Sequence, residues 1–377
     1  MLVLGVFLLQ FALSEACLLP AVCPPSNVGR VFCCPSFNGS VCGNAQGRGS
    51  CVALAVPRTV PDPDVPLDDR YEFPTFYYSH ICVCQPNFMG ADCGECSFNR
   101  GGQNCDRLTP VVRREWRQLT PKEQQTYKAQ MHYCKSKLNP DCYLVRTGDR
   151  MRRSSYDFFK ASYYDGWCYL HYYATKPFNR NGTERYIINY AHYSTAFLTW
   201  HKYFMLLLEK LMQICLKDPT FAIVYYDWQY DTSCAVCNDD GFGGNNALGE
   251  ISPYSAYSSW RVLCGAHDYP RTYCVSPAST CEWPLIRRRA GYVRGVTKPN
   301  YLDVNYCMRM PNLDTWPYDT SSVNSFRSCL EGWIDRFGRR TTAMHNLFHV
   351  WLGGTMSEVP YSCADVMFTL HHAFVDK

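Results

Sequence analysis

This chain has little histidine, no long basic run and no long apolar stretch beyond its start. Only 10 of its 377 residues are histidine, its longest basic run is Arg287-Arg288-Arg289, and its formal net charge is +4. Proteins that bind nucleic acid normally carry a basic tail or stripe, so we expect no nucleic-acid partner. A membrane-spanning helix needs about 20 mostly apolar residues, and no such stretch follows residue 13. We therefore expect no transmembrane anchor within these residues.

The first 16 residues predict a secretory signal peptide, although they lack the Lys or Arg that usually opens one. An apolar run from Leu2 to Leu13 precedes Ser14-Glu15-Ala16, which has small residues at the two positions that define a cleavage site. The run is shorter than the roughly 20 residues of a membrane-spanning helix. We therefore expect residues 1–16 to be removed and the chain to enter the secretory pathway.

Cysteine, in contrast, is abundant. In a chain that enters the secretory pathway, 23 cysteines predict disulfide bonds rather than free thiols. The odd number leaves at least one unpaired, and Cys17 is one candidate. Five cysteines in the second part of the chain have no partner that the sequence identifies: Cys134, Cys142, Cys168, Cys215 and Cys363. Two N-glycosylation sequons also occur, Asn38-Gly39-Ser40 and Asn181-Gly182-Thr183.

Eleven of the cysteines lie between residues 17 and 105, which predicts a small cysteine-rich domain over residues 17–107. Inside it, CVCQPNFMGADCGECSFNRGGQNC (82–105) combines closely spaced cysteines with glycines that suit tight turns. Such a small module cannot bury enough apolar surface and relies on cross-links. The pattern resembles an EGF-like or laminin-like domain. Zinc at Cys93-Gly94-Glu95-Cys96 is the alternative, although no second C-x-x-C follows at zinc-ribbon spacing.

The remaining residues, 108–377, predict a mainly helical domain with long connections. Thr120 as N-cap, Pro121 at the first helical position and Glu123 three residues after the cap mark a helix start. This helix should run to about Leu138, before Asn139-Pro140. Four further helices are expected over residues 155–175, 194–217, 340–352 and 365–376. From residue 249 to about residue 325 we expect mostly loops.

Seven of the ten histidines fall into four short segments, HYY (171–173), AHYSTAFLTWH (191–201), MHNLFH (344–349) and HHAFVD (371–376). Gathered imidazoles with almost no cysteine among them indicate a metal such as copper, zinc, iron or nickel. His345 and His349 are four apart and would share one helix face. His192 and His201 are nine apart, so they can meet one ion only if His192 precedes the helix that carries His201. Spacing alone does not decide between a two-metal site in a helix bundle and ordinary core packing.

The chain resembles the animal tyrosinases and tyrosinase-related proteins along its whole length. The matching segments are CVCQPNFMGADCGEC, AFLTWH (196–201), YYDWQYDTSCAVC (225–237), MHNLFH and HHAFVD. The resemblance implies a four-helix-bundle catalytic domain with a type 3 dicopper centre behind the EGF-like domain. It implies that His171, His192 and His201 hold one copper and that His345, His349 and His372 hold the other. His371 matches a position that is not a ligand.

The resemblance further implies a copper monooxygenase and oxidase. Such an enzyme uses dioxygen to hydroxylate monophenols such as tyrosine to catechols, and it oxidises catechols such as DOPA to o-quinones, the entry step of melanin synthesis. Its partners would be small phenolic substrates and dioxygen. Its location would be a melanosome-type lumen or the outside of the cell.

Five further residues match functional positions of the family. Asn346 and Glu331 match positions thought to hold a water that acts as a base; for Glu331 the alternative is a solvated carboxylate at a helix end. Val359 and Ser362 match residues near the second metal in the tyrosinase branch. Phe368 matches a phenylalanine packed over the ligands, a role compatible with ordinary core packing.

Three functions from different classes remain open. The first is the phenol oxidase. The second is a zinc-containing tyrosinase-related protein that isomerises dopachrome or has lost activity. The third is a hemocyanin-like carrier. The cysteine-rich N-terminal domain disfavours the carrier. His371-His372-Ala373 favours the oxidase, because tyrosinase-related proteins usually have one histidine followed by Thr or Ser.

The chain ends one residue after HHAFVD, where tyrosinases continue through the helix and usually reach a membrane anchor. We therefore expect the domain at 108–377 to be C-terminally incomplete. His372 would then lie near a frayed helix end. We therefore expect the chain to bind its second copper weakly. The alternative is that it is an inactive truncated paralogue.

Overall fold

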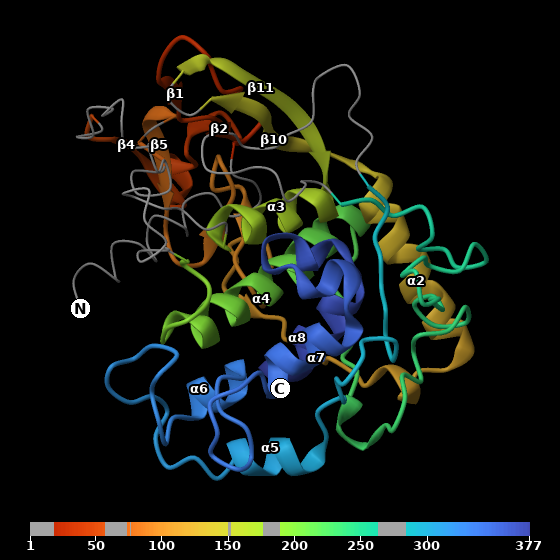
Figure 1. Ribbon diagram of the computed structural model, residues 1–377. Helices are drawn as coiled ribbons and strands as arrows, with labels where there is room; N and C mark the ends of the chain where they lie inside the picture. Colours follow the sequence, from red (N-terminus) through yellow and green to blue (C-terminus); the bar gives the residue numbers. More distant parts are fainter. Residues whose placement is uncertain (1–18, 57–73, 76, 150–151, 176–188, 263–283) are drawn as a thin grey trace.

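A computed structural model describes residues 19–56, 74–75, 77–149, 152–175, 189–262 and 284–377 of the chain. The predicted signal peptide, Cys17 and the sequon at Asn181 lie outside these residues. Short strands form the N-terminal part, and a helical body follows (Figure 1). Among the described residues, no helix has both the length and the apolar character needed to cross a bilayer.

The described residues of the N-terminal part form nine short strands, and β5 (Tyr78–Cys84) is central in their three-stranded sheet. It pairs in parallel with β1 (Val31–Cys33) and antiparallel with β4 (Gly49–Ala53). Six two-residue strands form three small hairpins: β2 (Ser36–Phe37) with β3 (Ser40–Val41), β6 (Phe88–Met89) with β7 (Glu95–Cys96), and β8 (Arg100–Gly101) with β9 (Arg107–Leu108). Such short strands bury little apolar surface, so cross-links must stabilise them.

Five disulfides provide these cross-links: Cys23–Cys33, Cys34–Cys51, Cys42–Cys82, Cys84–Cys93 and Cys96–Cys105. The buried cluster between the strands is made largely of the cysteines themselves. The zinc alternative for Cys93 and Cys96 is wrong, because each of these residues is disulfide-bonded to a different partner.

A long hairpin lies between α2 (Pro121–Ser136) and α3 (Tyr163–Thr175) in the sequence. It pairs β10 (Leu138–Asp149) with β11 (Arg152–Ser162) in antiparallel fashion. The predicted helix over residues 155–175 is therefore wrong in its first half, since residues 155–162 belong to a strand. Aromatic residues suit strands as well as helices, and pairing with β10, which periodicity cannot reveal, decides between the two.

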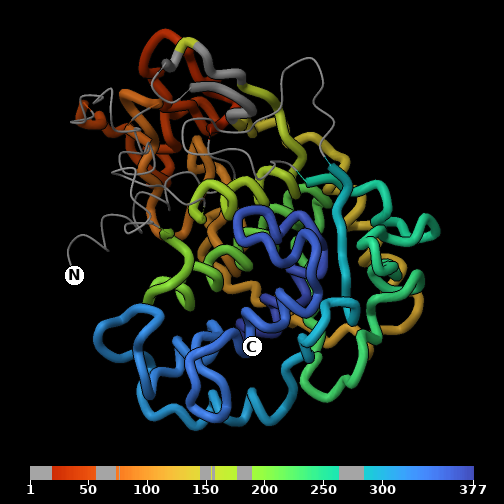
Figure 2. The backbone as a smooth tube through the Cα atoms, in the orientation of Figure 1, coloured from red at the N-terminus to blue at the C-terminus, as the bar shows by residue number. Residues whose placement is uncertain are grey.

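Seven helices are described in the body: α2 (Pro121–Ser136), α3 (Tyr163–Thr175), α4 (Ala196–Leu216), α5 (Tyr301–Cys307), α6 (Phe326–Glu331), α7 (Met344–Leu352) and α8 (Met367–Asp376). α2 begins as predicted, with a capping box between Thr120 and Glu123. α3 and α8 each pack against α4, in the centre of Figure 1. Residues 284–340, cyan to blue in Figure 2, run outside these helices and contain only α5 and α6.

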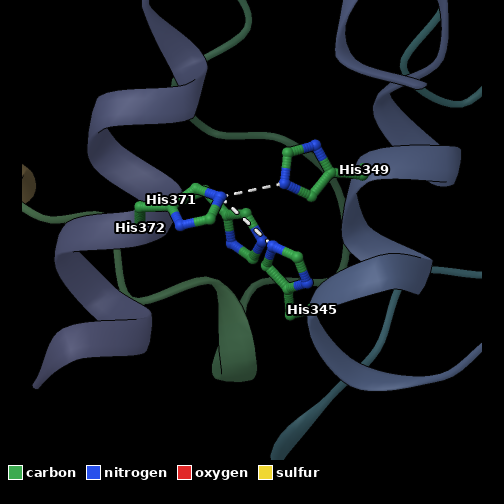
Figure 3. Close-up of side chains that lie close together, drawn as sticks. All are labelled: His345, His349, His371 and His372. Carbon is green, nitrogen blue, oxygen red and sulfur yellow. Dashed lines mark hydrogen bonds between the residues drawn. The ribbon is translucent and has the colours of Figure 1, made fainter. Parts of the chain in front are cut away.

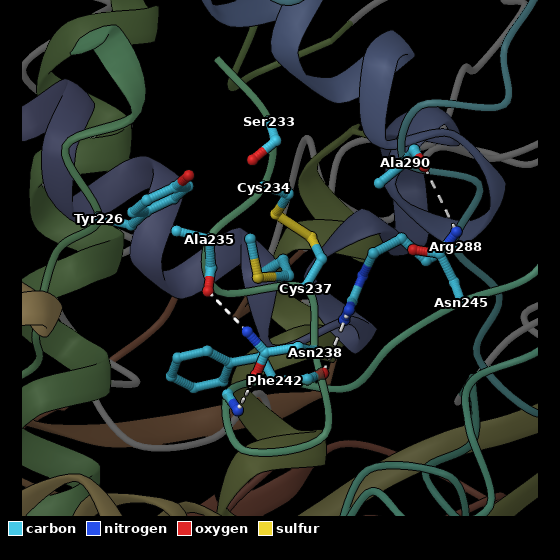
Figure 4. Close-up of a disulfide and its surroundings, with 12 residues drawn as sticks. Tyr226, Ser233, Cys234, Ala235, Cys237, Asn238, Phe242, Asn245, Arg288 and Ala290 are labelled. Carbon is cyan, nitrogen blue, oxygen red and sulfur yellow. Dashed lines mark hydrogen bonds between the residues drawn. A yellow bond between two sulfur atoms is a disulfide. The ribbon is translucent and has the colours of Figure 1, made fainter. Parts of the chain in front are cut away.

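Among the described residues, three disulfides and the buried ion pair of Arg288 with Asp365 connect helices and loops of the body. Cys134–Cys215 joins α2 to α4, Cys307–Cys329 joins α5 to α6, and Cys234–Cys237 closes a loop (Figure 4). Beside this loop the fully buried Arg288 donates to both carboxylate oxygens of Asp365, at 2.9 and 2.6 Å, and to the Phe242 carbonyl. Asp365 also accepts from the Met367 amide, so the start of α8 is tied to the body.

Candidate metal centre

One histidine trio comes from three separate elements. His171 lies on α3, His201 lies on α4, and His192 lies in the loop that precedes α4. Their ring centroids are 4.8 to 5.8 Å apart, and all three side chains are buried. This is the arrangement that nine-residue spacing predicted, with His192 outside the helix. We call His171, His192 and His201 the first trio.

A second group gathers between α7 and α8 (Figure 3). The Nε2 atom of His372 lies 3.1 Å from the Nε2 atoms of both His345 and His349. We call these three residues the second trio. The two trios adjoin each other, because the rings of His201 and His372 stack with centroids 4.7 Å apart. Six histidines from four separate segments of the sequence thus surround one small region.

Five of these six rings have their Nδ1 atom next to an oxygen that can accept its proton. The acceptors are Pro360 O for His171 (3.4 Å), Asn189 Oδ1 for His192 (3.3 Å), Phe197 O for His201 (2.9 Å), Glu331 O for His345 (3.1 Å) and Met356 O for His349 (2.8 Å). The hydrogen bonds assign the Nδ1–H tautomer, which leaves the Nε2 lone pair free. Metal-binding histidines are held in this way.

His371 differs from its neighbours in its hydrogen bond, although it lies within the same cluster. Its Nδ1 atom accepts from the indole Nε1–H of Trp228 at 3.1 Å. A neutral ring that accepts at Nδ1 carries its proton on Nε2 and offers no Nε2 lone pair. The ring also stacks on Phe348, with centroids 4.4 Å apart. His371 therefore fits a supporting role behind the second trio, not a ligand role.

The electrostatics keep these rings uncharged. Burial disfavours imidazolium and lowers the pKa of all seven histidines, to about 3 for His201 and about 4 for His349. The Nε2 atoms of His171 and His201 and the Nδ1 atom of His372 are buried without a hydrogen-bond partner. Neutral, convergent imidazoles with free lone pairs fit a borderline-soft metal such as copper.

Comparison with known proteins identifies the family. The sequence model described as the common central domain of tyrosinase matches residues 161–377. Tyrosinase from Canis lupus familiaris is 34% identical over 92% of this chain and 68% of its own length, and tyrosinase from Oryzias latipes is 34% identical over 100% and 73%. The chain belongs to the tyrosinase family.

Other members and more distant structures also match this tyrosinase-family chain. The 5,6-dihydroxyindole-2-carboxylic acid oxidase of Homo sapiens is 32% identical over 92% of this chain and 69% of its own length. A polyphenol oxidase structure from Thermothelomyces thermophila shares 19% identity at a TM-score of 0.46, covering 71% of this chain and 68% of that one. The predicted family is confirmed, the chain is a tyrosinase-type oxidoreductase, and its histidine clusters suit copper.

Phe368 lies between the two trios of this tyrosinase-family protein. Its ring stacks on His372 with centroids 3.8 Å apart and meets His171 edge-on at 5.2 Å. It is fully buried. The other two predicted substrate residues lie in the short 3-10 helix η6 (Val359–Ala364), where Val359 is 37% exposed. Ser362 is buried and donates its hydroxyl to the Val359 carbonyl at 3.2 Å.

Glu331 is fully buried at the end of α6, so the alternative of a solvated carboxylate is wrong. Its Oε1 accepts from the Tyr193 amide at 2.6 Å, and its Oε2 accepts from Arg327 at 3.3 Å. Burial raises the pKa of Glu331 to about 7 despite these donors. Its backbone carbonyl also accepts from His345 of the second trio. Glu331 therefore contacts His345 on one side and, through Tyr193, the loop that carries His192 on the other.

Two polar residues complete these surroundings. Asn346 is half-buried, and its Oδ1 lies 3.1 Å from Nδ1 of His345. Arg327 is fully buried and forms a two-pronged pair with Asp314, both bonds being 3.0 Å long. Sequence reasoning missed Arg327, although its position four residues before Glu331 on one helix face was a signal.

The end of α8 differs from the frayed end expected from the sequence. The helix remains regular to Asp376, and His372 is only 1% exposed. The Asp376 carboxylate accepts from Arg113 at 2.6 Å and from Lys202 at 3.1 Å. Arg113 also contacts both carboxylate oxygens of Glu209 on α4, at 2.8 Å each. These ion pairs hold the last turn of the helix that carries His372.

Proposed function

We propose that this protein is a two-copper monooxygenase that hydroxylates monophenols and oxidises catechols to o-quinones. The first trio would hold one copper and the second trio the other. One observation supports this proposal best. In these rings Nδ1–H donates to an oxygen, so the Nε2 lone pair of the same ring is available to a metal. Copper bound there would supply the redox chemistry with dioxygen that imidazole alone cannot perform.

The chain itself would manage the proton of the phenol. A phenol with a pKa near 10 binds a metal poorly until it loses that proton. We propose that Asn346 and Glu331 hold the water that accepts it. The amide of Asn346 is half-buried beside His345, and the pKa of about 7 for Glu331 allows proton transfer near neutral pH. Arg327 and the Tyr193 amide would keep the Glu331 carboxylate in place.

Phe368, Ser362 and Val359 would shape the surroundings of the substrate ring. Phe368 stacks on a second-trio ring and can restrict where an aromatic substrate lies. Val359 is the most exposed of the three, so we propose that it would meet substrate at the rim of the site. Ser362 would fix the backbone at Val359 through its hydroxyl.

Metal content and oxygen uptake test the proposal together. Protein purified with copper should contain two copper ions per chain and consume oxygen with tyrosine and with DOPA. The His349→Asn variant should lose both properties, whereas His80→Asn, a histidine change in the N-terminal part, should keep them. Two bound zinc ions without oxygen uptake would replace the oxidase with the zinc-containing alternative, which the same imidazoles could hold.

We also propose secretion or a melanosome-type lumen as the location. The disulfides described above need an oxidising compartment to persist. Asn38 is exposed in the turn between β2 and β3, where a glycan would meet no obstacle from the fold. A mobility shift after glycosidase treatment, absent in Asn38→Gln, would show that this sequon is used.

A further inference from the structure

Two cysteines of the helical body remain thiols, and they lie together. Cys168 is on α3, one helical turn before His171, and Cys363 is on η6, shortly before α8. They are 195 residues apart in the sequence. They are the free cysteines of the part of the chain that the structure describes.

The two thiols face each other across the contact between α3 and η6. The Sγ atom of Cys168 donates to the Cys363 carbonyl at 3.1 Å, and the Sγ atom of Cys363 donates to the Cys168 carbonyl at 3.4 Å. Cys168 is 3% exposed and Cys363 is fully buried. Since each sulfur already reaches the other backbone, a rotation about each Cα–Cβ bond can turn sulfur towards sulfur.

Other chemistry for these thiols is disfavoured. Neither sulfur belongs to a group of possible metal ligands among the described residues. Burial raises the pKa of the Cys168 thiol, so little thiolate is available to attack an external molecule. The reaction partner nearest to each thiol is therefore the other thiol.

We propose that Cys168 and Cys363 close a disulfide that ties α3 to η6. Two S–H bonds break and one S–S bond forms. Two electrons and two protons pass to a small-molecule disulfide such as oxidised glutathione, which becomes two thiols. Because both sulfurs are buried in the folded protein, this exchange takes place before η6 packs against α3. Once formed, the bond is shielded from reductants by the same burial.

The bond would reinforce the walls of both trios, a consequence that rests on the proposed metal sites. On one side it anchors α3 one turn before His171. On the other it anchors η6, whose Pro360 carbonyl accepts from Nδ1 of His171 at 3.4 Å. The same segment leads through Asp365 into α8 and His372. The cross-link would therefore hold the rings of the two trios at a fixed separation.

Peptide mapping tests the cross-link without any reference to metal. The full chain is folded with reduced and oxidised glutathione, denatured without reductant, alkylated with iodoacetamide and digested. We expect a linked peptide pair two hydrogens lighter than the separate peptides, with neither Cys168 nor Cys363 alkylated. Complete alkylation of both cysteines would overturn the proposal.

Metal retention tests the consequence for the trios. Cys168→Ser, Cys363→Ser and the double variant should all lose copper to a chelator several-fold faster than the unchanged protein, and to the same extent. Cys234→Ser/Cys237→Ser, which opens the loop disulfide, serves as the matched control and should retain copper. Unchanged retention in the double variant would overturn the effect on the trios, while the peptide map would still decide whether the bond exists.

Discussion

The two histidine trios are built in different ways. The second trio comes from two regular helices, and His345 and His349 owe their common direction to helical spacing. The first trio comes from three elements. His192 lies in a loop, and the residue after it, Tyr193, has a left-handed φ of 67°. In the loop, Asn189 Oδ1 accepts from both the amide and the ring of His192.

The difference teaches that the loop residue His192 relies on a side-chain oxygen as its Nδ1 acceptor, whereas His345 and His349 on α7 have backbone carbonyls as acceptors. Behind the second trio, Phe348 and Trp228 fill the space around His371. Around the first trio, amide and carboxylate oxygens hold the loop in position. Loss of a single hydrogen bond should therefore affect the first site more than the second.

The largest effect should separate two adjacent histidines of α8. His372→Asn removes a proposed ligand, so on the two-copper proposal we expect one copper fewer per chain and a fall in kcat/KM above the roughly 100-fold typical of losing a supporting contact. His371→Asn should keep both copper ions, because its Nε2 is protonated. Copper content and oxygen uptake measure both outcomes. Equal copper loss in the two variants would contradict the tautomer argument.

A large effect on stability should follow from Arg327→Gln. The change leaves the buried Glu331 without its cation and Asp314 without its two-pronged partner. Removing one member of a buried ion pair costs about 3–5 kcal/mol, which chemical denaturation can measure. Arg327→Lys keeps the charge and should lose less. The loop at Tyr193 should loosen in parallel, so chelators should extract the first copper before the second.

A smaller, site-specific effect is expected from Asn189→Ala. The variant removes the acceptor for Nδ1 of His192 and for the amides of Ala191 and His192. Loss of such a support typically weakens metal binding about 10–100-fold. Chelator competition should show this at one of the two copper ions only. Asn245→Ala, in a loop beside Ala290, is the control and should change neither. Equal weakening of both ions would mean that the sites are not independently built.

The smallest contrast concerns acid. In the folded, metal-free protein the pKa of His201 is about 3 and that of His349 is about 4. In the unfolded chain both imidazoles have a pKa near 6.5. Below about pH 6.5 the unfolded state therefore binds more protons, and stability falls as pH falls. Each ring contributes about 1.4 kcal/mol per pH unit until its folded pKa is reached. His349→Asn should reduce the slope of the unfolding free energy against pH from about pH 6.5 down to about pH 4. His201→Asn should reduce it down to about pH 3. Slopes identical to that of the unchanged protein would contradict this prediction.

Local patterns predicted much of the centre. The four-residue spacing in MHNLFH placed His345 and His349 on one face, and the nine-residue spacing placed His192 before α4. The family resemblance selected the six histidines that the structure brings together. These features depend on contacts within a helix or its cap, which a sequence displays directly.

Features that depend on distant partners were not predicted. The Tyr193 amide that donates to the buried Glu331 carboxylate lies 138 residues earlier. Residues 155–162 became a strand because β10 pairs with them. The joining of Cys134 to Cys215 likewise depends on how α2 and α4 pack. A spacing rule carries no information about such partners.

Arg113 has a consequence for the choice of solvent. One guanidinium group links Glu209 on α4 to Asp376 on α8, so a single cation ties together the helices that carry His201 and His372. Its side chain is 18% exposed, which leaves the link open to competing ions. Guanidinium chloride should therefore release copper at a lower concentration than urea would, well ahead of global unfolding. Spectra recorded in that denaturant would report a loosened α8, not an unfolded chain.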